Sequence, residues 1–139
     1  MKLVILDGSC LNPGDLDYSC LKQFGELTVY DKTESAQEAV SRIGNAEIVL
    51  VNKVPITKEI LDACPSIRYI GVLATGYNVI DCTEARRRGI PVTNVPDYGT
   101  AAVAQFTMAL LLELCHKVGL HSDAVHHGAW VESPVFSFW

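Results

Sequence analysis

The segment Ala74-Thr75-Gly76 has the residue types best suited to binding chemistry in this sequence. Small side chains let another molecule come close to the backbone, and successive N–H groups in a turn form a concave site for an anion. A compatible alternative is that Gly76 takes a positive φ in a tight turn and serves the fold alone. The segment therefore predicts an anion-binding turn.

A second candidate segment, Asn52-Lys53, follows an apolar run that ends at Val51. The Lys53 ammonium group carries the charge that complements a carboxylate or a phosphate. The alternative is a solvated side chain, which is the usual state of a single lysine in a loop. Both interpretations stay open for this pair.

Other reactive side chains do not form a recognisable site. No two of the four histidines are spaced i, i+4, and no cysteine or carboxylate completes a set of metal ligands at standard spacing. The five cysteines contain no C-x-x-C pair, so we expect free thiols in a reducing cytoplasm. No Gly-x-Ser-x-Gly motif is present. We predict neither a metal site nor an activated nucleophile.

The composition is that of a globular protein, with 49% hydrophobic and 19% charged residues. The formal net charge of −5 disfavours nucleic acid as a partner, because phosphates attract basic surfaces. The most hydrophobic stretch, residues 101–115, contains Gln105 and Glu113 and falls short of the roughly 20 apolar residues that span a bilayer. The N-terminus has no signal-peptide pattern, so we expect a cytoplasmic protein without a membrane contact.

Short apolar runs alternate with segments of helical periodicity over residues 1–99. This alternation predicts βαβ units and a flavodoxin-like parallel five-stranded sheet with helices on both faces. The carboxyl ends of parallel strands share one edge, where α/β proteins bind ligands, so the two candidate segments are expected to meet there. The expected strands are residues 2–7, 26–30, 47–51, 67–74 and 92–95.

Capping residues indicate where the helices begin. A short helix is expected over residues 15–23. Ser35 and Glu38 form a capping box at the start of a second helix. Thr57 is expected to cap a third helix and Asp81 a fourth.

Residues 100–126 are predicted to form one long helix. Its apolar residues run all round between Met108 and Leu112, which indicates that partners cover it on several sides. Aromatic residues follow, from Trp130 to Trp139. Two interpretations stay open: the segment forms a homodimer, or it packs against a further domain of the same protein.

Four segments together, in order and spacing, resemble the D-isomer-specific 2-hydroxyacid dehydrogenase family, and within it the glycerate dehydrogenase or hydroxypyruvate reductase branch. Each segment alone is weak, but four in register over essentially the whole chain are specific. Gln105 departs from the pattern, because the family usually has an acidic residue there. The segments are LATGYNVID at residues 73–81, RGIPVTNVP at 88–96, TAAVAQ at 100–105 and GAW at 128–130.

The resemblance implies a two-domain oxidoreductase that transfers hydride between NAD or NADP and a small 2-hydroxy or 2-keto acid. Residues 1–99 would form its catalytic, substrate-binding domain, and residues 100–139 a linking helix and aromatic segment leading into a Rossmann NAD-binding domain. The sequence has no G-x-G-x-x-G after residue 100, and the family's catalytic residues lie beyond that motif. We therefore expect a fragment without a catalytic residue and without tight cofactor binding.

The resemblance also implies roles for the candidate residues. Gly76 and its neighbours Ala74 and Thr75 donate N–H groups to the substrate, and Thr75 lies near the nicotinamide. The Asn52-Lys53 loop covers the substrate. Val103 lies near the cofactor, with packing in a core as its alternative interpretation.

A second class of function stays open. A self-standing flavodoxin-like module would have the same residues 1–99 and would bind a ligand, or dimerise through residues 100–126, without catalysis.

Overall fold

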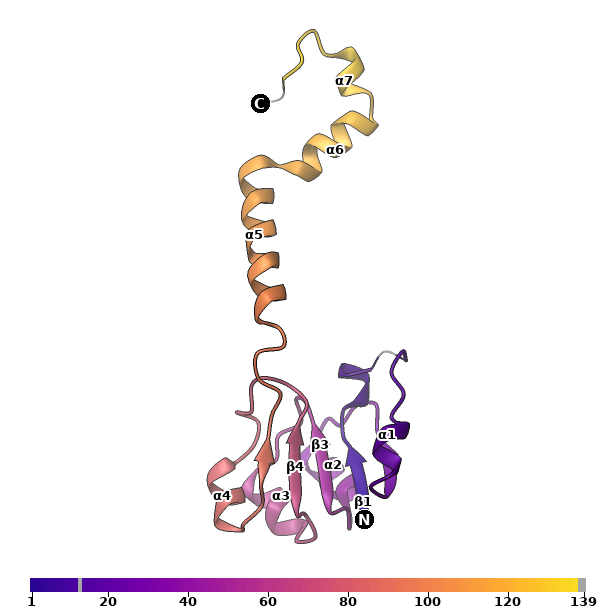
Figure 1. Cartoon of the computed structure of the whole chain (residues 1–139), viewed down its shortest axis with the longest axis vertical. Coiled ribbons are helices and arrows are strands. Elements are labelled where there is room, and N and C mark those ends of the chain that lie inside the picture. The colour runs from indigo at the N-terminus through magenta and orange to yellow at the C-terminus, as the bar shows by residue number, and fades with distance from the viewer. Residues whose placement is uncertain (13, 138–139) are drawn as a thin grey trace. The chain divides into compact units, whose positions relative to one another are not determined.

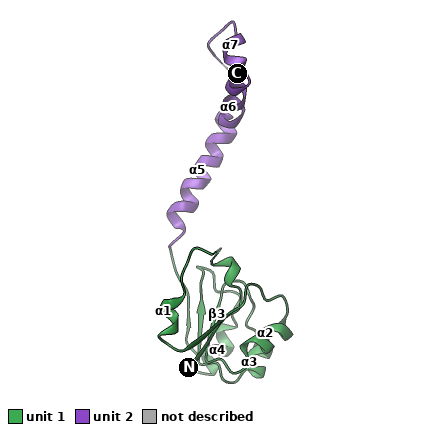
Figure 2. Ribbon diagram, turned by 90° about the vertical axis from the view of Figure 1, so that its right-hand side faces the viewer, with its two compact units in different colours: residues 1–97 green, residues 98–139 purple. Residues whose placement is uncertain are grey.

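The computed structural model describes residues 1–12 and 14–137 (Figure 1). The chain divides into two compact units, residues 1–97 and residues 98–139 (Figure 2). The last two residues of the predicted aromatic segment, Phe138 and Trp139, lie outside the described residues. The expectation that residues 100–139 lead into a nucleotide-binding domain stays a prediction.

The first unit contains one parallel sheet of five strands in the order β2-β1-β3-β4-β5. This order is the flavodoxin-like one, and it confirms the predicted fold class. The register pairs Val4 with Val49 and Val51 with Val72, so the central strands end at the same level. The strands are β1 (Lys2–Ile5), β2 (Glu26–Val29), β3 (Ile48–Val51), β4 (Tyr69–Val72) and β5 (Val92–Thr93).

Helices lie on both faces of this sheet, as predicted. Helix α1 covers one face, and α2, α3 and α4 line the other side by side (Figure 2). A short 3-10 helix, η1, follows β1. The bounds are η1 (Gly8–Cys10), α1 (Ser19–Lys22), α2 (Ala36–Ile43), α3 (Lys58–Ala63) and α4 (Cys82–Arg87).

Both faces of the central strands are buried, which explains why these strands are apolar throughout. Leu3, Ile5 and Leu50 are buried although they do not belong to the cluster beneath α2, α3 and α4. They point to the opposite face because successive side chains of a strand alternate. The cluster itself includes Val4, Val49, Val51, Ile70 and Val72 from the strands and Ala39, Ile43, Ile60 and Leu61 from the helices.

Several expected elements are shorter than predicted. The strands predicted over residues 2–7 and 67–74 span only Lys2–Ile5 and Tyr69–Val72, and two further elements have a visible cause for their shorter length. The Asn12 side chain accepts a hydrogen bond from the N–H group of Leu16 at 2.9 Å and donates one to the carbonyl of Leu16 at 2.6 Å. These bonds hold Leu16 outside a helix, so that α1 begins only at Ser19. Strand β5 ends at Thr93 because the next two residues bond to the loop after β4 instead of continuing the ladder. The predictions of a helix over 15–23 and a strand to residue 95 are wrong in length.

The caps predicted at Ser35 and Asp81 are confirmed, although the return bond of the predicted capping box differs, because the Glu38 side chain accepts from the N–H group of Glu34 and not from that of Ser35. The Ser35 side chain accepts a hydrogen bond from the N–H group of Glu38 at 3.1 Å, and Asp81 accepts one from Glu84 at 2.9 Å. Thr57 occupies the N-cap position of α3, but its side chain makes no capping bond. The third prediction is therefore right in position and wrong in chemistry.

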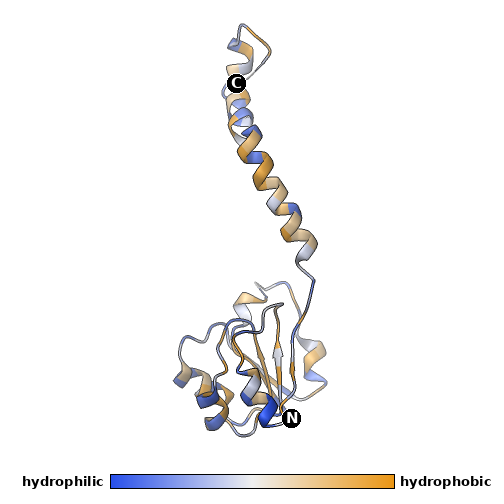
Figure 3. Ribbon diagram, turned by 90° about the vertical axis from the view of Figure 1, so that its left-hand side faces the viewer, coloured by the Kyte–Doolittle hydropathy of each residue, from blue (hydrophilic) through white to orange (hydrophobic). Residues whose placement is uncertain are grey.

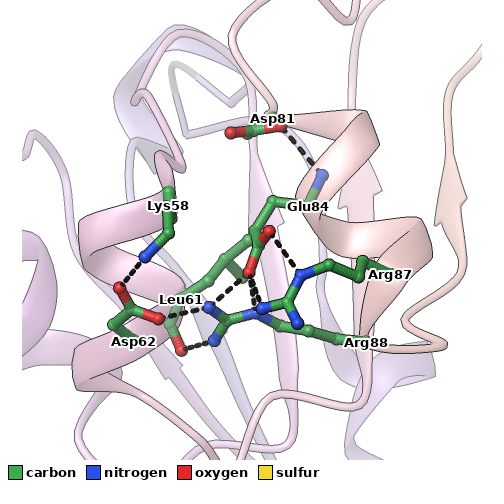
Figure 4. Close-up of polar contacts among 7 residues, drawn as sticks. All are labelled: Lys58, Leu61, Asp62, Asp81, Glu84, Arg87 and Arg88. Atoms are coloured by element: carbon green, nitrogen blue, oxygen red, sulfur yellow. Dashed lines mark hydrogen bonds and ion pairs between the residues drawn. The ribbon is translucent and has the colours of Figure 1, made fainter.

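An ion cluster joins α3 to α4 (Figure 4). The Glu84 side chain accepts hydrogen bonds from Arg87 at 2.6 and 2.9 Å and from Arg88 Nε at 2.7 Å. Arg88 continues to α3, where it donates to the carboxylate of Asp62 and the carbonyl of Leu61. Hydrogen bonds from the two guanidinium groups lower the pKa of Glu84 from 4.5 to about 2.

The second unit contains α5 (Thr100–His116), α6 (Val118–His126) and α7 (Ala129–Glu132). The prediction of one helix over residues 100–126 is wrong, because Lys117 takes a left-handed conformation with φ of 48°. The Glu113 carboxylate accepts a hydrogen bond from the N–H group of Gly119 at 3.1 Å, which caps the first turn of α6. The axes of α5 and α6 differ by 60°.

Helix α5 is mostly apolar, and its residues 108–112 are apolar on every side of the helix; the side seen in Figure 3 is largely orange with a few hydrophilic positions. Its large apolar side chains are exposed in this chain; Phe106, Leu110 and Leu114 are 65%, 52% and 78% exposed. No single helix in the described part of the chain is long and apolar enough to span a membrane, and α5 with α6 meets that requirement only as a bent pair.

Candidate functional site

The two candidate segments follow neighbouring strands at the carboxyl edge of the sheet. Asn52 and Lys53 come directly after β3, and residues 74–76 come after β4. The N–H group of Leu73 donates to the carbonyl of Val51 at 2.7 Å, so the two strands remain paired up to the start of both loops. The structure thus places both predicted segments on the same edge of one unit.

The loop after β4 is tied down through its oxygen atoms. The carbonyl of Ala74 accepts a hydrogen bond from the N–H group of Val95 at 3.1 Å, and Thr75 Oγ1 donates to the carbonyl of Val95 at 3.1 Å. The Asn94 side chain donates to the carbonyl of Thr75 at 2.9 Å. These three bonds fix the loop against the segment that follows β5.

The N–H groups of the same loop have no such partners. No described residue accepts a hydrogen bond from the backbone N–H groups of Thr75, Gly76 or Tyr77. All three residues are exposed. A run of free N–H donors on a fixed loop is a site for an anionic group.

Gly76 does not adopt the positive φ that its alternative interpretation requires, and that expectation is wrong. A Cβ atom at this position would meet only the Asn78 side chain, at 3.4 Å. Neither backbone conformation nor packing therefore demands a glycine here. What the missing side chain provides is open access to the backbone.

The loop after β3 is organised by Asp7, a residue whose role the sequence reasoning missed. Asp7 is 3% exposed at the end of β1. Its carboxylate accepts hydrogen bonds from the N–H groups of Asn52 at 2.9 and 3.0 Å, Lys53 at 2.5 Å and Val54 at 3.3 Å. The available signal was an acidic residue directly after an apolar buried run.

The two side chains of this loop differ in their access to a ligand. Asn52 Oδ1 is buried and accepts no hydrogen bond from any described residue. Lys53 is exposed, and its ammonium group has no carboxylate partner in the part of the chain that the structure describes. Lys53 is therefore the side chain of this loop that a ligand can reach directly, while Asn52 Oδ1 is closed to solvent.

Val103, the residue predicted to contact the cofactor, lies on α5 in the other unit. Its side chain is 66% exposed, so the alternative of packing in a core is not met among the described residues. Its contact with a cofactor stays a prediction.

Comparison with known proteins gives a consistent result. Residues 5–133 match the family model described as the catalytic domain of D-isomer specific 2-hydroxyacid dehydrogenases. The chain is 55% identical to a hydroxypyruvate reductase of Blautia hydrogenotrophica over all of its own length, which is 44% of that relative. It is 30% identical to a glycerate dehydrogenase of Methylorubrum extorquens, over 99% of this chain and 43% of that protein. The chain thus spans less than half the length of these relatives.

Among solved structures, the chain resembles an acyclic imino acid reductase in complex with NADPH and D-Arg. The TM-score is 0.76 and the sequence identity 26%, over 92% of this chain and 41% of that one. The nucleotide and the amino acid belong to that protein, whose fold the chain shares.

Proposed function

This chain belongs to the D-isomer specific 2-hydroxyacid dehydrogenase family, and from that premise we propose that it forms the substrate-binding wall of an oxidoreductase. The reaction interconverts a small 2-keto acid and the corresponding 2-hydroxy acid by hydride transfer, with hydroxypyruvate and glycerate as the best candidates. The 55% identity to a hydroxypyruvate reductase supports this choice of substrate.

The observation that carries the proposal is the row of unpaired N–H groups at Thr75, Gly76 and Tyr77. The substrate carboxylate is anionic, and a hydrogen bond to a charged group contributes about 1.5–3 kcal/mol. The loop is held by bonds to its oxygen atoms, so the donors are already oriented before the substrate arrives. We assign carboxylate binding to this loop, with Ala74 as its buried anchor.

Asn52 and Lys53 complete the proposed wall from the neighbouring strand. The Lys53 ammonium group adds positive charge near an anionic substrate. Asn52 lies next to Lys53 and is proposed to line the substrate site, although its Oδ1 is buried and does not face a ligand. We therefore assign charge recognition in this loop to Lys53.

A nicotinamide cofactor, NAD or NADP, supplies or accepts the hydride when it is bound. We propose Thr75 and Val103 as the residues of this chain that contact it. Neither residue carries a charge, and the chain contains no G-x-G-x-x-G motif to hold a pyrophosphate. We therefore expect the chain by itself to bind the dinucleotide weakly and to provide no catalytic residue.

We also propose a homodimer through residues 100–126, in a cytoplasmic protein. The exposed large apolar side chains of α5 support an association, since monomeric proteins rarely expose a large apolar patch.

A second candidate function is a self-standing binding module without catalysis. It is favoured by the first unit, which has a complete sheet and its own core. The two candidates differ in catalytic turnover. Only the substrate-binding part of an oxidoreductase supports turnover when it is joined to a nucleotide-binding domain.

A chimera tests this difference. This chain would replace the matching 44% of the Blautia hydrogenotrophica reductase, and oxidation of NADH and NADPH would be followed with hydroxypyruvate, glyoxylate, pyruvate and 3-phosphohydroxypyruvate. We expect turnover with hydroxypyruvate at a rate within about tenfold of the parent enzyme. A folded chimera that turns over none of the four acids would refute the proposed function and support the binding module.

A further inference from the structure

We propose that Asp7 is a positioning residue that holds the loop of residues 52–54 in the orientation needed to meet the substrate. This inference rests on the proposed function, because it concerns the same site. Asp7 acts through Asn52 and Lys53 and does not touch the substrate itself.

The carboxylate of Asp7 accepts hydrogen bonds from three consecutive backbone N–H groups. The N–H groups of Lys53 and Val54 both reach Oδ2, at 2.5 and 3.3 Å, while that of Asn52 reaches both oxygens at 2.9 and 3.0 Å. Asp7 is 3% exposed. Both oxygens are therefore occupied within the protein, and the group does not serve as a proton acceptor for a ligand.

Asp7 is itself held by the sheet and not by the loop. On one side of it, the N–H group of Leu6 donates to the carbonyl of Leu50 at 3.1 Å. On the other side, the N–H group of Gly8 donates to the carbonyl of Tyr30 at 2.8 Å. The carboxylate is thus a fixed point of the scaffold, between two neighbouring strands, against which the loop is oriented.

The interaction satisfies both partners. A buried carboxylate is costly unless it is hydrogen-bonded, and the loop N–H groups would be without acceptors if the carboxylate were absent. Charge-assisted bonds of this kind are about twice as strong as neutral ones. The loop therefore has one strongly preferred orientation, with Asn52 partly buried and Lys53 exposed at the edge of the sheet.

The chemistry of the group matters more than its size. An asparagine side chain at this position has the same shape, but its NH2 group would face at least one of the N–H donors and would leave that donor without an acceptor. The Asp7→Asn variant should therefore loosen residues 52–54 while the sheet and core stay intact.

The first measurement uses the chain as it is. Amide hydrogen exchange of Asn52, Lys53 and Val54, followed by NMR, should accelerate at least tenfold in Asp7→Asn relative to the strand amides of Val49 and Leu50. Asp31→Asn is the matched control, because Asp31 is exposed at the end of β2 and its backbone carbonyl, not its carboxylate, binds Ser9. It should leave the exchange of all five amides unchanged.

The second measurement uses the chimera with hydroxypyruvate. Asp7→Asn should raise KM by about tenfold, which corresponds to about 1.4 kcal/mol, with kcat reduced less than threefold, because loop orientation affects binding of the ground and transition states alike. Asp7→Glu keeps the charge and should recover at least part of the lost affinity, which also covers the case that Asp7→Asn folds poorly.

The outcomes separate this inference from the proposed function. An unmodified chimera without turnover refutes the function itself. An active chimera in which Asp7→Asn loosens the loop amides but leaves KM unchanged refutes only the positioning role. Unchanged exchange at residues 52–54 refutes it as well, since the loop would then be held by other contacts.

Discussion

The side chain of Thr75 donates a hydrogen bond to the carbonyl of Val95 at 3.1 Å and so joins the candidate loop to the segment after β5. A second hydrogen bond joins the same two segments in the opposite direction, because the N–H group of Val95 donates to the carbonyl of Ala74. The loop that offers free N–H groups is consequently fixed at two successive residues. Its ability to bind an anion depends on that fixation, because a mobile loop would have to be ordered on binding and the entropy lost would lower the affinity.

Replacing Thr75 by Val removes the hydroxyl donor and keeps the shape of the side chain. We expect the free energy of unfolding to fall by about 0.5–1.5 kcal/mol, measured by urea denaturation, since one hydrogen bond is lost at an exposed position. KM for hydroxypyruvate in the chimera should rise. Thr75→Ser keeps the donor and is the control, and equal KM values for the two variants would show that the bond does not support binding.

Replacing Gly76 by Ala separates an effect on substrate binding from an effect on the stability of the fold. The added Cβ would meet only the Asn78 side chain at 3.4 Å, so the free energy of unfolding should change by less than about 0.5 kcal/mol. The methyl group would stand where the substrate approaches the backbone, and KM should rise by tenfold or more, about 1.4 kcal/mol.

Gly25→Ala provides the contrast, because its Cβ would lie 2.0 Å from the carbonyl oxygen of Met1 and its φ is +149°. That variant should lose about 1–3 kcal/mol of stability. A Gly76→Ala chimera with an unchanged KM would remove this loop from the substrate site.

Lys53→Gln tests whether the lysine is a ligand contact or a solvated side chain. If its ammonium group faces the substrate carboxylate, KM should rise by about threefold to tenfold, and the difference between variant and parent should shrink as the salt concentration increases. Lys58→Gln is the matched control, because Lys58 is exposed on α3 and is paired with Asp62. Equal KM values in the two variants would favour the solvated interpretation.

The periodic features of the sequence were enough to predict the sheet. Alternation of apolar runs with helical segments identified all five strands, and capping chemistry located Ser35 and Asp81 correctly. These signals are local, so a single sequence contains them in full.

Features that depend on contacts between distant residues were missed. The Asp7 carboxylate binds N–H groups that are separated from it by 45 to 47 positions in the sequence. Nothing near Asp7 in the sequence indicates which loop it will contact. The early end of β5 has the same origin, since residues 94 and 95 bond to the loop after β4. The predicted edge was right because topology alone brings the ends of parallel strands together.

The break at Lys117 was missed for a different reason. Apolar residues occur on both sides of the break, and neither neighbour of Lys117 is proline. The interruption instead depends on Glu113 bonding forward to the N–H group of Gly119, a local side-chain contact that the apolar periodicity does not indicate. Helical periodicity therefore predicted the helical state of residues 100–126 but not their continuity.

The ion cluster around Glu84 predicts a specific dependence of stability on pH. The pKa of Glu84 is about 2 in the folded chain and about 4.5 without its partners, so folding favours the ionised carboxylate. This contribution is fully present above pH 4.5 and is lost progressively as the pH falls from 4.5 toward 2, because the unfolded chain takes up the proton first.

Urea midpoints measured between pH 7 and pH 3 should therefore fall for the parent chain. Glu84→Gln should be less stable than the parent at pH 7, and the gap between them should narrow toward pH 3. Glu34→Gln is the control, since Glu34 is exposed and its ion pair with Lys32 lies at the surface, and it should follow the parent curve closely. A gap between parent and Glu84→Gln that stays constant over this range would show that Glu84 stabilises the contact between α3 and α4 by packing and not by its charge.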